Sequence, residues 1–296
     1  MTTFTPRRSA YRTLIWAGLA LWAVLAIIFA FTDEAISDAL YNPHSGWADF
    51  LECYGQMPAA FLGAIGGSIL LRLSRPSQGA RQALASAGLL LLTVLMALAF
   101  MADATGLQAK ADPNPGIVLG GTIAIVLLMQ VALRFAGRER LESLRPASKV
   151  AVALPLIAGI LTVWMIKVPW GRWTYRDILE AGDRLLFTPW YLPQGNNGHH
   201  SFISGHTAFS FSVLPIALFF SRSRTVFNTI LTLALTWGLI GALSRVVVGA
   251  HFAADTLFAA GLTITWFVVL SRRFRAIPES PDSPRSADEH TEQQHQ

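Results

Sequence analysis

Long apolar stretches separated by short polar segments make up most of the chain. Their lengths approach the roughly 20 residues that a helix needs to cross a bilayer, although several run slightly short. Within them the apolar residues run on without the alternation typical of outer-membrane barrel strands. The pattern predicts an all-α fold, a polytopic membrane helix bundle. About eight transmembrane helices are expected, at Leu14 to Phe31, Pro58 to Leu73, Leu84 to Met101, Ile117 to Phe135, Val150 to Ile166, Thr207 to Phe220, Val226 to Leu243 and Phe252 to Leu270.

Composition favours the same class of protein. Of the 296 residues, 53% are hydrophobic and only 14% are charged, and the mean hydropathy is +0.45. A soluble domain carries roughly 25% charged residues. The single cysteine, Cys53, cannot form an intramolecular disulfide, and no Cys/His spacing is typical of a structural zinc site. The composition therefore argues against a soluble protein and against a disulfide or metal scaffold.

The first apolar stretch has two interpretations. Arg7, Arg8 and Arg12 precede it, as basic residues precede the core of a signal peptide. However, no small-residue cleavage site follows this stretch. Instead, it is followed by the acidic residues Asp33 and Glu34. We therefore expect a retained helix.

Basic residues are distributed unevenly around the expected spans. The net charge of +5 and the pI of about 9.8 are compatible with nucleic-acid binding, but the basic residues lie in short clusters between apolar stretches. With a cytoplasmic N-terminus, 17 of the 23 Lys and Arg residues fall on the cytoplasmic side, as the positive-inside rule requires. We expect both termini in the cytoplasm and no nucleic-acid partner. The six outer exceptions are Lys110, Lys167, Arg172, Arg176, Arg184 and Arg245.

The chain divides into three expected parts. Residues 1–148 hold the first four spans, and an external segment near 33–55 is expected to lie at the lipid interface because it mixes acids with Tyr and Trp. Residues 149–275 hold the other four spans. Residues 276–296 are rich in Pro, Ser, Glu and Gln, which predicts a disordered cytoplasmic tail. Neither the external segment nor the tail carries an expected catalytic residue.

Three segments near outer span ends carry the residues suited to chemistry. Ser204 is a plausible N-cap, so that the two residues after it would lie in a first helical turn, where free N–H groups favour an anion. His251 and Asp255 are four apart and share a helix face, so the carboxylate can hold the imidazole in one tautomer. The segments contain Lys167, Arg172 and Arg176; Ser204, Gly205 and His206; and Ser244, Arg245, His251 and Asp255.

The three segments are expected to meet at the outer membrane surface. One helical hairpin between His206 and Ser244 returns Arg245 and His251 to the face that carries Lys167. Ionisable residues at membrane ends facing a bundle are functional candidates. Lys and Arg neutralise a tetrahedral anion, one His can attack phosphorus and the other can protonate the leaving oxygen. The residues therefore predict a site for a phosphate ester.

This constellation resembles the type 2 phosphatidic acid phosphatase (PAP2) superfamily. That family has a Lys-Arg segment, then Ser-Gly-His, then Ser-Arg-x5-His-x3-Asp, and the third element matches in full from Ser244 to Asp255. The resemblance covers roughly Val150 to Leu270. It implies a PAP2-like catalytic core in the C-terminal half of a bacterial integral-membrane lipid phosphatase of the cytoplasmic (inner) membrane.

The chain departs from the family pattern at two positions. Ile203 stands before Ser-Gly-His, where the family usually has proline. Thr174 stands where the first family segment usually has the arginine of Arg-Pro. Arg172 and Arg176 are the residues available to replace that arginine.

The resemblance implies a role for each matched residue. His251 would be the nucleophile that forms a phosphohistidine, Asp255 would orient it, and His206 would protonate the leaving group and then activate water. No metal or other cofactor is expected, because cations take its place; His199 and His200 lie near His206, but no Asp, Glu or Cys completes a ligand set. The expected phosphate-binding residues are Lys167, Arg172, Ser204, Gly205, Arg245 and Arg176.

The sequence leaves several related substrates and reactions open. Trp and Tyr near the site favour a phosphate attached to a lipid in the bilayer. Candidates are undecaprenyl pyrophosphate, lipid A, phosphatidylglycerophosphate and phosphatidic acid, with a prenyl pyrophosphate slightly preferred. A lipid phosphotransferase would use the same residues, and a non-catalytic transporter of an anionic lipid would use the cations alone. The sequence does not determine the oligomeric state or the role of the first four helices.

Overall fold

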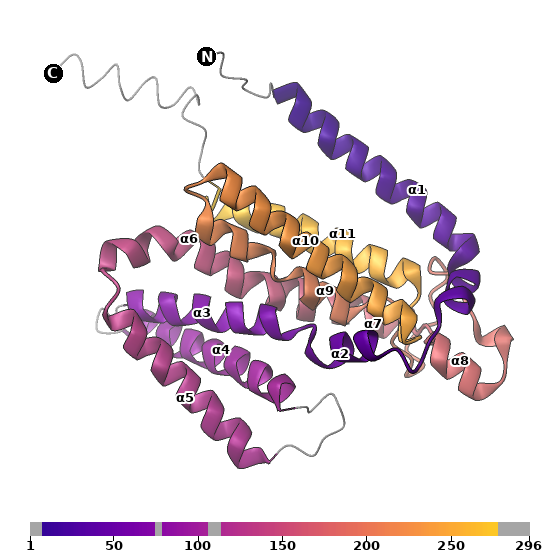
Figure 1. Cartoon of the computed structure of the whole chain (residues 1–296), viewed down its shortest axis with the longest axis horizontal. Helices are drawn as coiled ribbons and strands as arrows, with labels where there is room; N and C mark the ends of the chain where they lie inside the picture. The colour runs from indigo at the N-terminus through magenta and orange to yellow at the C-terminus, as the bar shows by residue number, and fades with distance from the viewer. Residues whose placement is uncertain (1–7, 75–78, 106–113, 278–296) are drawn as a thin grey trace.

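The computed structural model describes residues 8–74, 79–105 and 114–277 (Figure 1). Most of these residues are helical, and no strand occurs among them. Lys110 and, from residue 278 onward, the expected tail lie outside the described residues. In chain order the elements are α1 (Arg8–Leu40), α2 (Gly46–Tyr54), α3 (Met57–Leu73), α4 (Ala80–Ala104), α5 (Pro115–Arg134), α6 (Arg138–Leu154), η2 (Pro155–Thr162), α7 (Val163–Trp170), α8 (Tyr175–Ala181), η3 (Arg184–Leu186), α9 (Gly205–Phe211), η4 (Leu214–Phe220), α10 (Arg224–Val247) and α11 (Ala253–Arg273).

Seven helical stretches in the described part of the chain are long and apolar enough to cross a membrane. They confirm the predicted all-helical membrane fold. Of the about eight expected spans, Thr207 to Phe220 is not one continuous helix, because the chain forms two short helices, α9 and η4, between Gly205 and Phe220. Pro215 lies in the first turn of η4, where its missing N–H fits a helix start but cannot continue the hydrogen bonds of the helix before it.

Helices α6, η2 and α7 form one long helical rod that leads to the candidate active site. Its middle part, η2, is a π-helix that begins at Pro155, where the lack of an N–H group interrupts the regular α-helical hydrogen bonds. The rod ends at Gly171, whose φ of 59° is the left-handed conformation that commonly terminates helices. This stop leaves Lys167 in the last turn of α7.

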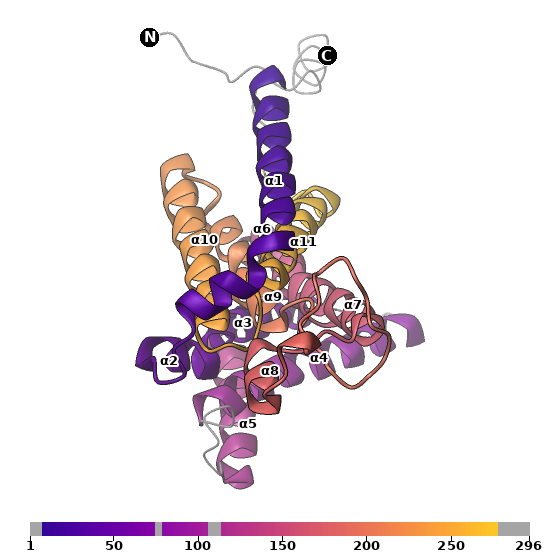
Figure 2. The same ribbon diagram turned by 90° about the vertical axis from the view of Figure 1, so that its right-hand side faces the viewer.

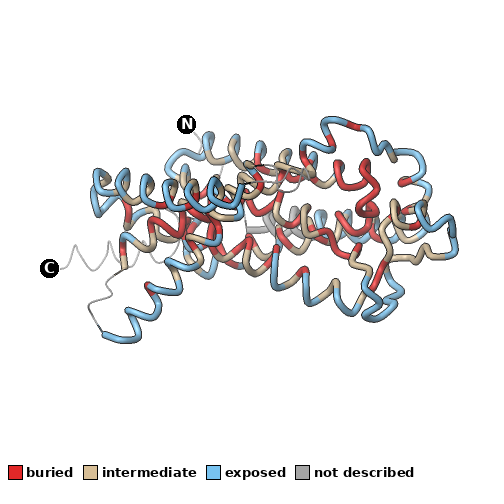
Figure 3. The backbone as a smooth tube through the Cα atoms, turned by 90° about the horizontal axis from the view of Figure 1, so that it is seen from below, coloured by how far each residue is buried: buried red, intermediate tan, exposed pale blue. Residues whose placement is uncertain are grey.

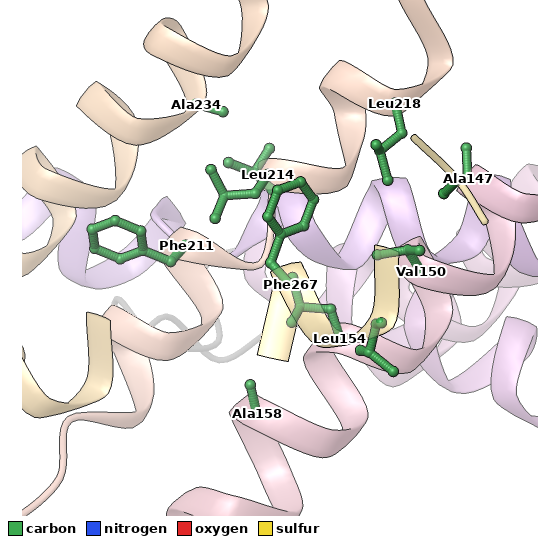
Figure 4. Packing of buried hydrophobic residues seen from close by; sticks show 12 residues of the cluster. Ala147, Val150, Leu154, Ala158, Phe211, Leu214, Leu218, Ala234 and Phe267 are labelled. Atoms are coloured by element: carbon green, nitrogen blue, oxygen red, sulfur yellow. The ribbon is translucent and has the colours of Figure 1, made fainter. Parts of the chain in front are cut away.

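A buried apolar cluster holds the C-terminal half together. Leu154, Phe211, Leu214 and Phe267 bring α6, α9, η4 and α11 into contact (Figure 4). A Cβ atom at Gly238 of α10 would lie 2.7 Å from the ring of Phe211, so glycine is needed for the close approach of α9 to α10. The cluster therefore fixes the relative positions of the helices whose ends carry the candidate residues.

The outer turns of the bundle are exposed, whereas the buried residues lie along its interior (Figure 3). Many of the exposed side chains are large and apolar, which is the arrangement suited to contact with lipid tails. On α5 they are Ile117, Leu119, Ile123, Leu127, Leu128 and Val131. The exposed surface thus agrees with a multi-pass membrane protein.

Helix α1 stands apart from the bundle at its start and joins it farther along (Figures 1 and 2). The indole Nε1 of Trp22 donates a hydrogen bond to the carbonyl oxygen of Leu257 in α11, at 3.2 Å. The helix continues to Leu40, so Asp33 lies within a helix. Helix α1 therefore brings an acidic side chain to Arg172 and to the start of α11.

Candidate active site

Lys167, His206, Arg245 and His251 lie together in the folded chain. They come from the last turn of α7, the first turn of α9, the last turn of α10 and the loop between α10 and α11. His206 is close enough to Lys167, Arg245 and His251 to interact electrostatically with each of them. The fold therefore brings together the three segments that the sequence analysis singled out.

His251 is buried and held in one tautomer. Its Nδ1 atom lies 2.7 Å from the backbone carbonyl oxygen of Ser201. A carbonyl oxygen can only accept, so Nδ1 carries the hydrogen and Nε2 keeps its lone pair. Burial lowers the pKa of His251 from 6.5 to about 4, against the opposing effect of the Asp255 carboxylate. At neutral pH the imidazole is therefore neutral, as a nucleophile must be.

Asp255 is fully buried and held from several sides. One carboxylate oxygen accepts from the Arg172 guanidinium at 2.5 Å, and the other accepts from the Ser201 hydroxyl at 2.5 Å and from the Phe252 N–H at 2.9 Å. The distance from Asp255 Oδ2 to His251 Nδ1 is 3.7 Å, which is too long for a hydrogen bond. Ser201 links the two, because its hydroxyl binds the carboxylate and its carbonyl binds the imidazole.

Arg172 lies behind the nucleophile and is only 1% exposed. Its guanidinium bonds Asp255 and Asp33, the latter at 2.9 Å, and its Nε donates to the carbonyl oxygen of Thr188 at 2.8 Å. The guanidinium carbon also lies 4.1 Å from the centre of the Phe252 ring. All three of its nitrogen atoms therefore have protein partners, which favours a role in positioning Asp255 over the expected contact with phosphate.

Arg245 is also buried, but its guanidinium is only partly engaged. The Nη2 atom donates to the Glu52 carboxylate of α2 at 2.8 Å. The Nε and Nη1 atoms are buried and have no hydrogen-bond partner among the described residues. The Arg245 carbonyl accepts from the backbone N–H groups of Ala250 and His251, which ties the end of α10 to the histidine loop.

Ser204 caps the N-terminus of α9 as expected. Its hydroxyl oxygen accepts from the Thr207 N–H at 3.2 Å and from the Thr207 hydroxyl at 3.0 Å. This cap places Gly205 and His206 in the first turn. The Ser204 N–H donates to the carbonyl oxygen of Asp255 at 3.2 Å, so the start of α9 is attached to the start of α11.

Thr174 and Arg176 lie at the rim of this region. The Thr174 hydroxyl caps α8 by accepting from the Asp177 N–H, so this position, where the family usually has arginine, serves helix formation. The Arg176 side chain is 43% exposed and reaches Glu52 at 3.5 Å. Its charge is therefore near Arg245 but in a more solvated position.

Three residues at the site were not anticipated from the sequence: Asp33, Glu52 and Ser201. Asp33 and Glu52 belong to the segment that was expected to lie at the lipid interface without catalytic residues. Each pairs with an arginine more than a hundred residues away along the chain. The position of Asp33 directly after an apolar stretch could have marked it as a candidate residue. Nothing in the neighbouring sequence, however, indicates that its partner is Arg172. Among the described residues, no group of three or more His, Cys, Asp or Glu side chains is arranged to hold a metal ion.

Comparison with known families places this site in context. Residues 149–277 match the family model of the PAP2 superfamily, and the match includes His206, Arg245, His251 and Asp255. This segment therefore belongs to the PAP2 superfamily, a family of membrane phosphatases. Comparisons with curated proteins and with solved structures found no match. Asp33 and Glu52 lie outside the matched segment.

Proposed function

We propose that this protein is a lipid phosphatase that removes a phosphate or pyrophosphate group from a lipid at the extracytoplasmic face of the membrane. The observation that supports it best is the pair of unpartnered donors on Arg245, whose side chain is only 3% exposed. Buried N–H groups without partners are costly. A phosphate bound beside His206 and His251 would satisfy them, so the site is suited to an anion.

The first step is an attack on phosphorus by Nε2 of His251. The bond between phosphorus and the lipid oxygen breaks, and His206, which takes up a proton when the negatively charged phosphate binds beside it, donates that proton to the lipid oxygen. The resulting phosphohistidine carries an additional positive charge on the imidazole ring, which the carboxylate of Asp255 stabilises. In the second step His206 takes a proton from water, the water oxygen attacks phosphorus, and the phosphorus–nitrogen bond breaks to release phosphate.

Positively charged groups and backbone donors stabilise the charge on the phosphoryl oxygens in both steps. We assign phosphate binding to Lys167, Arg245 and the first turn of α9, at Ser204 and Gly205, with Arg176 attracting the anion from the rim. Arg172 is assigned to Asp255 because its nitrogen atoms are already engaged. This arrangement needs no metal, since the arginine and lysine charges serve the same purpose.

The surroundings of the site favour a lipid substrate. Between α8 and α9 the chain exposes Leu185, Tyr191 and Leu192, which are suited to the depth of lipid headgroups. The carboxylate of Glu52 adjoins Arg245 and would repel further phosphate groups. A lipid with one compact phosphate or pyrophosphate fits these charges best, and a prenyl pyrophosphate remains our first choice.

Phosphate release from a panel of purified lipid phosphates, in detergent and with and without a lipid acceptor, tests the proposal. We expect release without an acceptor, loss of turnover in His251→Ala and His206→Ala, and no inhibition by EDTA. Release only with an acceptor would identify a phosphotransferase. Binding of the lipids without turnover would indicate a transporter, and strong EDTA inhibition reversed by a divalent ion would contradict the mechanism.

A further inference from the structure

We propose that Asp33 of α1 is a positioning residue of the active site and acts on Asp255 through Arg172. The inference rests on the proposed function. It assigns a role to a helix that lies outside the segment matched to the PAP2 superfamily. The reacting groups would then depend on a residue supplied by the N-terminal half of the chain.

Both carboxylate oxygens of Asp33 bind groups that hold the start of α11. The Oδ2 atom accepts from Arg172 at 2.9 Å, and the Oδ1 atom accepts from the backbone N–H of Ala254 at 2.8 Å. Ala254 is in the first turn of α11, one residue before Asp255. Asp33 is 1% exposed, so solvent screens these interactions little. It therefore holds Asp255 by two routes, the backbone and the guanidinium.

The arrangement also controls how much of the Asp255 charge remains available to His251. Arg172 is shared between two carboxylates, so the buried trio of Asp33, Arg172 and Asp255 carries a net charge of −1. If Asp33 were neutral, the Arg172 charge would compensate Asp255 alone and the trio would be neutral. The positive charge that His251 gains during phosphoryl transfer would then be stabilised less. Asp33 therefore favours the transition state without touching the substrate.

A purely structural role for Asp33 makes a different prediction. Helix α1 is independently attached to α11 through the hydrogen bond from Trp22 to Leu257. If Asp33 only anchored α1, its neutralisation would lower the free energy of unfolding and leave turnover by the folded protein unchanged. A role in positioning Asp255 instead lowers kcat while KM for the lipid stays nearly constant.

Asp33→Asn is the variant that separates these roles. Asparagine has nearly the same size and keeps an oxygen that can accept from the Ala254 N–H, but its NH2 group replaces the oxygen that accepts from Arg172, so the charge and the Arg172 interaction are lost together. Glu34→Gln is the matched control, because Glu34 is the next residue on α1 but pairs with the half-exposed Arg184. In purified, monodisperse protein we expect kcat to fall roughly tenfold or more in Asp33→Asn, with KM changed less than about twofold, and no change in Glu34→Gln.

A second comparison covers the case in which Asp33→Asn does not fold. The double variant Asp33→Asn/Arg172→Gln leaves one uncompensated carboxylate in the buried trio, that of Asp255, whereas Arg172→Gln alone leaves two. If Asp33 acts through Arg172, the double variant has about the same kcat as Arg172→Gln alone. Equal kcat in wild type and folded Asp33→Asn, or losses that multiply in the double variant, would overturn the inference while the proposed function stands. If the wild type shows no turnover that is lost in His251→Ala, the proposed function is contradicted, and the inference that rests on it is contradicted as well.

Discussion

The Nδ1 atom of His251 lies 2.7 Å from the Ser201 carbonyl oxygen but 3.7 Å from the nearer carboxylate oxygen of Asp255. A backbone carbonyl therefore sets the tautomer, and the carboxylate acts mainly through its charge. Because a backbone carbonyl does not titrate, the tautomer is independent of pH. The availability of Nε2 for attack then depends only on the protonation of His251 itself.

The first prediction concerns the pH dependence of turnover. Burial lowers the pKa of His251 to about 4, so the imidazole stays neutral between pH 4 and 6.5, where a solvent-exposed imidazole takes up a proton. Because the Asp33 carboxyl binds Arg172 and also titrates, the profile is measured in Asp33→Asn, where we expect kcat/KM to be maintained as the pH falls through 6 and to decrease only as it approaches 4. The profile is measured in detergent micelles and corrected for the ionisation of the substrate phosphate, whose second pKa is about 6. An acid limb near 6.5 that survives this correction would contradict the assignment.

The second prediction concerns Arg245. Lysine keeps the charge but carries all its donors on one nitrogen, whereas arginine binds Glu52 through Nη2 and offers Nε and Nη1 as separate donors, so Arg245→Lys should lower kcat/KM by roughly a hundredfold. Arg176→Ala should lower it only a few-fold, because that side chain is 43% exposed and screened by solvent. Steady-state kinetics on one lipid phosphate compare the two. Equal losses in both variants would place Arg176 among the residues that bind phosphate directly.

The third prediction concerns Glu52, whose carboxylate accepts a hydrogen bond from Nη2 of Arg245. Glu52→Gln removes a negative charge beside the phosphate site, so inorganic phosphate should inhibit more strongly, with an inhibition constant lowered about threefold or more. The matched control is Asp49→Asn, an exposed acid on the same short helix α2. Weaker inhibition in Glu52→Gln than in the wild type would show that Glu52 is needed to orient Arg245.

The fourth prediction concerns the orientation in the membrane. The excess of Lys and Arg on one side of the spans predicts that the site lies outside the cytoplasm. Reporter fusions should read as external after Leu40, Ala104 and Val248, and as cytoplasmic after Ser74, Phe135 and Arg275. A cytoplasmic signal after Val248 would place Arg245 and His251 on the inner side and contradict the extracytoplasmic site.

The fifth prediction concerns the lipid part of the substrate. A headgroup held at the interface by its chains gains the positioning that a freely diffusing ester lacks, so removal of the chains should lower kcat as well as affinity. A short water-soluble phosphomonoester and the lipid substrates are compared at equal concentration in detergent. Comparable turnover of both would contradict the lipid assignment.

Much of this architecture follows from local sequence patterns. Continuous apolar stretches determine where helices cross the membrane, because backbone groups in lipid must be hydrogen-bonded within the helix. The seven membrane-length helices follow this rule. The relative placement of Arg245, His251 and Asp255 could also be predicted, because these residues lie close together along the chain. They lie at the end of α10, in the short loop after it and in the first turn of α11. The sixth expected span, Thr207 to Phe220, was predicted as one continuous helix, but Pro215 divides it into two short helices.

The partners of the candidate residues were decided only by the tertiary structure. Arg172 looked like a phosphate ligand because an outer cation with no visible partner is normally available to an anion. The fold places it between Asp33 and Asp255, which are 139 and 83 residues away. In the same way Glu52 meets Arg245 across 193 residues. Ion pairs of this kind leave no periodic pattern in the sequence, since they depend on how separate helices pack. The sequence therefore determined the membrane class and the residues available for chemistry, whereas packing decided which cations are neutralised by carboxylates and which remain available for phosphate.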